Sequence, residues 1–239
     1  MNDRRRFLGL AVIAGSGFAL AALPSRAETK RKSKTAPKAA PPPLAATVNP
    51  TEDLMREHGI LLRMLLIYEE GVRRLEEGST ISADIFASTL RLNQRFSEGY
   101  HQKLEEDHVF SKMEVAGKLT ELTRVLRGQH DAERKLTAQL LKNATPSGLG
   151  GSERRTALVD GLRSLNRMLR PHTAWEDTVL FPAFHQLLTE REFEKLGEVF
   201  EETEHQVLGP AGFQGILGEV VQLERGLGID KLSSFTVHI

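Results

Sequence analysis

The chain has 239 residues, of which 40% are hydrophobic, with 32 basic residues, 32 acidic residues, eight histidines and no cysteine. The lack of cysteine excludes disulfide bonds, thiolate metal sites and cysteine nucleophiles, so any metal must be bound by nitrogen and oxygen ligands. A net charge of zero argues against a broad nucleic-acid surface, and we predict no nucleic-acid partner.

Residues 1–27 have the three parts of an export signal. Arginines at positions 4, 5 and 6 precede an apolar run over residues 10–23, and a small-x-small exit ends at Ala27. Paired arginines before Phe-Leu are typical of a twin-arginine signal. We therefore predict transport by the twin-arginine translocase, cleavage after Ala27, and a periplasmic or otherwise exported protein. The alternatives are a general secretory signal and a membrane anchor. The run is shorter than the ~20 residues of a membrane span, so we expect no stable membrane insertion after cleavage.

Residues 28–50 form a separate segment that is rich in Lys, Ala and Pro. With almost no large apolar residue, this segment cannot bury enough surface to offset the entropy lost on ordering. We predict a disordered spacer, with contact between its basic residues and a membrane or cell wall as the alternative. Residues 1–50 carry nine Lys and Arg against two Asp and Glu, a net charge of +7, which leaves −7 for residues 51–239.

From residue 51 onward the apolar residues recur at intervals of three and four, which predicts an all-α fold. Interruptions in this pattern divide residues 51–190 into four long amphipathic helices, expected at about 49–78, 82–117, 119–143 and 152–188. The strongest interruption is a loop at 145–151, and Pro171 and Pro182 are expected to kink or limit the fourth helix. Four such helices with short connections predict an antiparallel four-helix bundle.

Residues 191–239 form a C-terminal extension with weaker helical patterns at 190–207 and 213–225. We expect these extra helical segments to pack on the outside of the bundle or on a partner. A repeat with a period of 20 to 50 residues is not found in the sequence, which argues against a helical repeat array.

Each of the four predicted helices carries one histidine on its apolar face, and two of these histidines are followed four residues later by a glutamate. Residues four apart lie on one face of a helix. The set comprises His58 on the first helix, His101 and Glu105 on the second, His130 on the third, and His172 and Glu176 on the fourth.

A core that contains these six groups needs something to neutralise them, because a buried polar group without a partner costs about 1–3 kcal/mol. A single inward histidine is ordinarily a hydrogen-bonded core residue. Four of them on separate helices, with two carboxylates, favour two metal ions instead, since imidazole suits iron, zinc and copper and carboxylates can bridge two metals.

The residues around these positions resemble the hemerythrin (HHE cation-binding) family. The similar runs lie at 56–59, 100–110, 128–131 and 170–182, and the most specific is His172-x-x-x-Glu176-Asp177-x-x-Leu180-Phe181-Pro182. The resemblance implies a four-helix bundle with two non-haem iron ions in its core and a small ligand, which is dioxygen, nitric oxide or peroxide. Carried over by position, the terminal ligands are His58, His101, His130 and His172, and the bridges are Glu105 and Glu176.

The third helix departs from the pattern of oxygen-carrying hemerythrins, which have a further histidine one turn from the first. Here Leu126 and Arg134 stand four residues before and after His130. One iron therefore has an open position, or is completed by water or another residue, for which Glu133 and His205 are candidates. This departure argues against reversible oxygen carriage and leaves redox chemistry and sensing as alternatives.

The sequence leaves further functions open. A metal-binding or sequestering protein without turnover would need the same ligands, and a di-iron peroxidase or oxidase would use the same centre. A ferritin-like carboxylate oxidase would instead use Glu-x-x-His pairs, which occur at Glu105/His108 and Glu202/His205. In a hemerythrin-like centre, a dry pocket would be lined by Leu62, Leu65, Leu104, Leu165 and Leu169.

Overall fold

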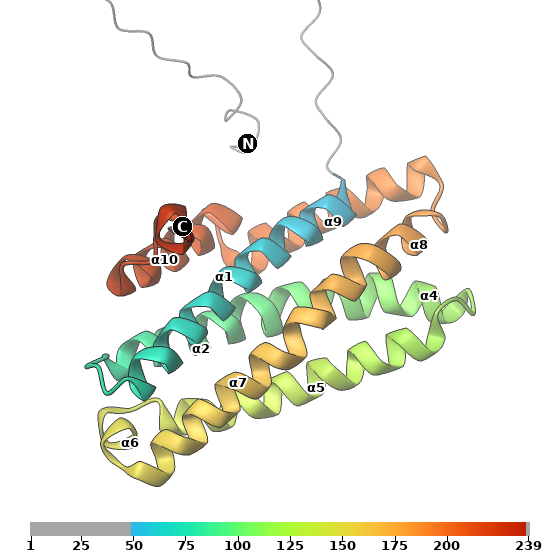
Figure 1. Ribbon diagram of the computed structural model, residues 1–239. Helices are drawn as coiled ribbons and strands as arrows, with labels where there is room; N and C mark the ends of the chain where they lie inside the picture. Colours follow the sequence, from blue (N-terminus) through green and yellow to red (C-terminus); the bar gives the residue numbers. More distant parts are fainter. Residues whose placement is uncertain (1–48, 238–239) are drawn as a thin grey trace, which may run out of the picture. The chain divides into compact units, whose positions relative to one another are not determined.

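Four long helical rods lie side by side with alternating direction (Figure 1). This computed structural model describes residues 49–237, so the predicted export signal and all but the end of the predicted spacer lie outside the described residues. The first rod is α1 (Pro50–Glu76) and the third is α5 (Thr120–Asn143). The second rod is built from α2 (Ala83–Asn93), the π-helical segment η2 (Gln94–His101), α3 (Gln102–Leu104), the π-helical segment η3 (Glu105–Phe110) and α4 (Ser111–Val115). The fourth is built from α7 (Ser152–Trp175), the π-helical segment η4 (Glu176–Leu180) and α8 (Phe181–His185).

Each rod packs against two neighbours. α1 contacts α2 and α7, and α5 contacts the same two helices, so the rods form a closed ring around one interior. Buried apolar side chains fill that interior, among them Met64, Phe86, Phe110, Leu162 and Phe181. Burying each such side chain contributes about 1.5–3 kcal/mol to stability. The predicted all-α, antiparallel four-helix bundle is confirmed.

Capping residues define the two ends of the first rod close to the predicted positions. The side chain of Asn49 accepts hydrogen bonds from the backbone N–H groups of Thr51 and Glu52, and Pro50 occupies the first turn. Both features satisfy the free donors at a helix start. Gly78 follows the helix with a φ of 71°, a left-handed conformation that glycine adopts without steric cost.

The two prolines do not limit the fourth rod. α7 runs through Pro171 to Trp175, and α8 runs through Pro182 to His185. Each proline removes one backbone donor, but buried side chains beside them, such as Leu169 and Phe181, hold the rod in the core. The departure from α-helical geometry falls between the prolines, in η4.

The predicted loop at 145–151 contains a short helix, α6 (Pro146–Gly150). The hydroxyl of Thr145 accepts a hydrogen bond from the backbone N–H of Gly148 at 3.0 Å, and Pro146 occupies the first helical position. The Thr-Pro pair, which reads as a turn in the sequence, therefore acts as a helix start.

The C-terminal extension contains α9 (Glu190–Leu208), α10 (Gly212–Leu227) and the 3₁₀ segment η5 (Leu232–Phe235). α10 packs against α1 and α2, and α9 packs against α1 and η2. The guanidinium of Arg63 donates to Glu224 at 2.7 Å, and that of Arg56 lies 4.5 Å from the centre of the Phe213 ring. The extra segments thus pack on the outside of the bundle, as predicted.

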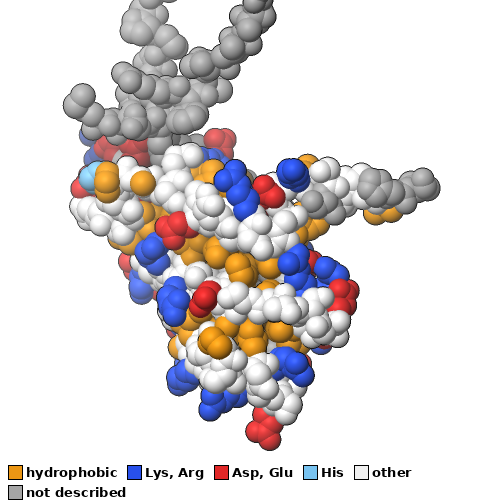
Figure 2. All heavy atoms as spheres, turned by 90° about the vertical axis from the view of Figure 1, so that its left-hand side faces the viewer, with side chains coloured by type: hydrophobic (Ala, Val, Ile, Leu, Met, Phe, Trp, Pro, Cys, Tyr) orange, Lys and Arg blue, Asp and Glu red, His pale blue; other side chains and the backbone are white. Residues whose placement is uncertain are grey.

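The described residues contain no membrane-spanning helix, and the face shown in Figure 2 carries both signs of charge. Within residues 49–237, none of the helices is long and apolar enough to cross a membrane. On the face in Figure 2, basic and acidic side chains are interspersed with apolar ones.

Candidate metal centre

The second and fourth rods leave α-helical geometry where the predicted site residues lie. η2 ends at His101, η3 begins at Glu105, and η4 begins at Glu176. A π turn contains one residue more than an α turn and changes the direction of the side chains after it. Such turns occur frequently at functional sites.

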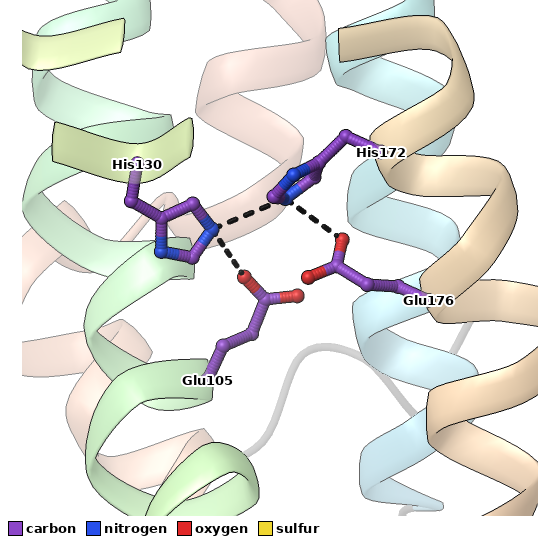
Figure 3. Close-up of side chains that lie close together, drawn as sticks. All are labelled: Glu105, His130, His172 and Glu176. Atoms are coloured by element: carbon purple, nitrogen blue, oxygen red, sulfur yellow. Dashed lines mark hydrogen bonds and ion pairs between the residues drawn. The ribbon is translucent and has the colours of Figure 1, made fainter. Parts of the chain in front are cut away.

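The structure brings all six predicted site residues together inside the bundle. Each of the six side chains is at most 5% exposed: His58, His101, Glu105, His130, His172 and Glu176. Figure 3 shows four of them, which point toward one another from the second, third and fourth rods. The six residues form two overlapping groups, and in each group the possible ligand atoms lie within 4.8 Å of one another. One group contains His58, His101 and Glu105, and the other contains Glu105, His130, His172 and Glu176.

The two carboxylates lie between two pairs of imidazoles. One oxygen of Glu105 is 3.3 Å from Nε2 of His101, and its other oxygen is 3.4 Å from Nε2 of His130. One oxygen of Glu176 is 3.1 Å from Nε2 of His172 and 3.4 Å from Nε2 of His58. We therefore distinguish a His58/His101 half and a His130/His172 half, which share both carboxylates.

The polar atoms at the centre of this cluster fit metal ions. Nε2 of His58 and both oxygens of Glu105 and Glu176 make no hydrogen bond of acceptable geometry among the described residues, and imidazole nitrogens lie 3.1–3.7 Å from the carboxylate oxygens. Nε2 of His130 and Nε2 of His172 face each other at 3.1 Å. Buried polar atoms of this kind cost free energy unless something binds them. Four imidazoles and two carboxylates, without thiolates, suit iron, zinc, copper or manganese.

The outer nitrogen of each imidazole is held by a side chain from the preceding rod around the ring. Nδ1 of His58 lies 2.6 Å from Asp177, and Nδ1 of His101 lies 2.8 Å from Glu57. The two remaining pairs are His130 with Glu106 at 3.0 Å and His172 with Gln129 at 2.8 Å. An Nδ1–H that donates outward leaves the Nε2 lone pair free to bind a metal.

These four outer partners share a sequence feature that the histidine and glutamate spacing does not reveal. Each one is adjacent in the chain to a predicted site residue on its own rod, and it holds the histidine of a different rod. The adjacent pairs are Glu57/His58, Glu105/Glu106, Gln129/His130 and Glu176/Asp177. Acidic or amide residues next to the predicted ligands are therefore the signal that could have identified them.

The charge of the outer partners differs between the two halves. In the His58/His101 half both partners are carboxylates, Asp177 and Glu57. In the other half, Glu106 also accepts a hydrogen bond from the guanidinium of Arg134, and Gln129 is neutral. A carboxylate partner raises the basicity of an imidazole ligand, so the His58/His101 half is the stronger donor.

The carboxylates also control the protonation of the metal-free site. Burial lowers the pKa of His101, but Glu105 and Glu57 outweigh burial and raise this pKa to about 9. Glu105 and Glu106 likewise raise the pKa of His130 to about 9 against the effect of burial. Burial raises the pKa of Glu105, but the surrounding imidazoles hold it well below its usual range. Protons and metal ions therefore compete for the same atoms.

The candidate additional ligands lie elsewhere. Glu133 is buried but accepts hydrogen bonds from Asn93 and Gln102, and His205 is exposed on α9. Of the leucines expected to line a dry pocket, Leu65, Leu104, Leu165 and Leu169 are buried. Leu62 is 38% exposed, so its assignment to the pocket is wrong.

Residues 49–184 match the family described as the hemerythrin HHE cation binding domain, and a second match covers residues 121–210. The chain belongs to this family. Proteins of Mycobacterium bovis and of two strains of Mycobacterium tuberculosis, all described as uncharacterized, are each 44% identical to it over 189 residues. The shared region covers 79% of this chain and 74% of each relative. No solved structure matches the chain. Membership of a cation-binding family, with the buried His/Glu groups, makes the bundle core a hemerythrin-like candidate metal site.

Substituting single ligands should remove metal from one half or from both. We expect His58→Ala and His172→Ala each to retain about half of the metal bound by the unsubstituted chain, and Glu105→Gln to retain much less, because both halves share Glu105. Elemental analysis of the purified variants measures this. His185→Ala, an exposed histidine on α8, is the matched control and should bind the full amount. Equal metal content in all four variants would contradict the assignment.

The metal-free protein should lose stability as the pH rises above 6.5. The pKa values of His101 and His130 are about 9 when folded, against 6.5 for an unperturbed histidine, so the folded state binds these protons more tightly. The resulting stabilisation is complete below pH 6.5 and disappears as the pH rises to about 9. Thermal unfolding of chelator-treated protein between pH 6 and 9.5 measures the change, and His130→Gln should show a shallower fall. A constant or rising stability over this interval contradicts the prediction.

Proposed function

We propose that this protein is an exported non-haem di-iron protein that binds dioxygen, nitric oxide or peroxide at the hemerythrin-like centre. The observation that carries the proposal is the pair of shared carboxylates, whose buried oxygens make no hydrogen bond of acceptable geometry within residues 49–237 and lie 3.1–3.7 Å from imidazole nitrogens. Carboxylates so placed between two pairs of imidazoles suit two adjacent cations. Two bound iron ions would supply redox chemistry and a binding position for a small ligand.

The residues of the chain would have three roles in such a protein. The Nε2 atoms of the four histidines would bind the metal ions, and Glu105 and Glu176 would bridge them. The outer partners hold each imidazole in one orientation, which limits the reorganisation on metal binding. Aromatic rings cover the cluster, because Phe181 stacks on His58 at 5.5 Å and Phe110 stacks on His130 at 5.3 Å. A site enclosed in this way favours small ligands.

The residues of the third rod around His130 favour an open coordination position for an external ligand. The two sequence positions one turn from His130 hold Leu126, which is 1% exposed and packs in the core, and Arg134, whose guanidinium binds Glu106 and Asp131. Neither side chain is a metal ligand type in this setting. Four imidazoles instead of five would therefore hold the two ions, and the remaining coordination would be available to the bound molecule.

A ferritin-like carboxylate oxidase is less well supported by the geometry. Its Glu-x-x-His pairs would need His108 or His205 at the centre. The His108 ring lies 5.7 Å from that of Phe200, and His205 is exposed on α9. A protein that sequesters metal without turnover, or a di-iron peroxidase or oxidase, would use the same ligands and would differ only in whether a reaction takes place after ligand binding.

Small-ligand binding is tested on reduced, iron-loaded protein. Adding dioxygen, or adding nitric oxide or peroxide under anaerobic conditions, should change the optical spectrum, with about one molecule bound per pair of ions. Removal of the ligand with recovery of the first spectrum indicates a carrier or sensor, and repeated consumption of peroxide or dioxygen indicates an enzyme. A fully loaded protein that responds to none of the three ligands is a metal-binding protein without this function. His58→Ala serves as the control with a disrupted centre.

Export is tested separately from metal binding. The double substitution of Arg4→Lys and Arg5→Lys removes the paired arginines and should reduce export by the twin-arginine route by at least about tenfold. Fractionation of cells that express the full chain, followed by immunodetection, measures the exported fraction. Arg26→Lys, which lies outside the arginine pair, should export normally. Unchanged export of the double variant would point to a general secretory signal.

A further inference from the structure

Glu133 is a buried carboxylate outside the predicted ligand set. It lies on α5, three residues after His130, and is 1% exposed. Its oxygens accept hydrogen bonds from Asn93 at 2.8 Å, Ser97 at 3.2 Å and Gln102 at 2.7 Å. All three donors belong to the second rod and are at most 2% exposed. One carboxylate of the third rod thus binds three buried side chains of the second.

The spacing of the three donors does not fit an α-helix. Asn93 and Ser97 are four residues apart, but Ser97 and Gln102 are five apart. In an α-helix, residues five apart are rotated by about 140° around the axis, so Ser97 and Gln102 could not reach the same carboxylate. They do so here because the backbone N–H of Gln102 bonds to the carbonyl of Ser97, which closes a π turn.

The same π turn decides where His101 points. In an uninterrupted α-helix, residue 101 would share the face of Ser97 and turn toward Glu133. In the π turn Gln102 takes that direction instead. His101 then faces Glu57, at 2.8 Å from Nδ1, and Glu105, at 3.3 Å from Nε2.

We propose that Glu133 is a positioning residue that selects the π-helical register of η2 and thereby directs His101 into the His58/His101 half. The carboxylate binds Ser97 and Gln102 together only when the π turn is present. An α-helical turn would leave Glu133 without its bond to Gln102 and would withdraw His101 from Glu57. The inference rests on the proposed metal centre for its function, but the register of η2 is a property of the metal-free chain and can be tested without metal.

Two variants remove the two partners of the hydrogen bond between Gln102 and Glu133 one at a time. Glu133→Leu removes the acceptor, and Gln102→Leu removes the donor while the carboxylate stays. Leu140→Ala, a buried residue of the same helix α5, is the control for a general loss of stability. The probe is Co²⁺, whose optical spectrum reports its ligands. His101→Ala and His172→Ala provide reference spectra for a disrupted His58/His101 half and a disrupted His130/His172 half.

We expect Glu133→Leu and Gln102→Leu to weaken Co²⁺ binding in the His58/His101 half by about 10- to 100-fold, with spectra like that of His101→Ala. Leu140→Ala should bind Co²⁺ as the unsubstituted chain does. Wild-type affinity in Glu133→Leu, or a spectrum like that of His172→Ala, overturns the proposal. Loss of binding in Glu133→Leu but not in Gln102→Leu also overturns it, because Glu133 would then act as a ligand.

A crystal structure of metal-free Glu133→Leu tests the register directly. The bond between the Gln102 N–H and the Ser97 carbonyl should be replaced by an α-helical bond from the His101 N–H. Retention of the π turn in this variant overturns the proposal. If the unsubstituted chain binds no Co²⁺, the proposed centre fails, and the crystal structure still shows whether Glu133 selects the register.

Discussion

The structure depends on a ring of hydrogen bonds around the bundle interior. Each rod supplies one imidazole to the interior, and the residue beside a ligand on each rod holds the imidazole of the next rod: Glu57 holds His101, Glu106 holds His130, Gln129 holds His172, and Asp177 holds His58. Since the outer nitrogen is bound in every case, the inner nitrogen is turned to the centre. Four rods that share such bonds cannot slide or rotate independently without exposing buried polar atoms to an apolar core.

The four rods that carry this ring of hydrogen bonds differ in helical geometry. The first and third rods, α1 and α5, are continuous α-helices, and each carries one histidine and one outer partner. The second and fourth rods each carry a histidine, a glutamate and an outer partner. The second and fourth rods contain the π-helical segments η2, η3 and η4, which end at His101, begin at Glu105 and begin at Glu176, respectively. A π turn is rare in an α-helical rod and occurs frequently at functional sites. In η2, the π turn is accompanied by the hydrogen bonds of Glu133 with Ser97 and Gln102.

The two halves of the candidate centre have the same kinds of inner side chain and different surroundings. Carboxylates support both imidazoles of the His58/His101 half, whereas Arg134 and the neutral Gln129 reduce the negative charge around the other half. Two cations bound in such a centre would experience different electrostatic fields. The bundle encloses both halves, with stacked aromatic rings on His58 and His130. In a member of a cation-binding family, this enclosure supports a candidate metal site in the bundle core.

The sequence by itself determined the helical fold and the residues that meet in the core. Periodicity of three and four locates the rods, and a histidine on each apolar face must enter the interior once the rods pack. It also indicated the pairs His101/Glu105 and His172/Glu176, because residues four apart share a face. Only the tertiary structure decided that Glu133 binds the second rod, that Leu62 faces outward, and that Asp177 and Glu57 hold histidines of other rods. These outcomes depend on π turns and on the relative rotation of neighbouring rods, which arise from contacts between distant segments and leave no periodic signal in the chain.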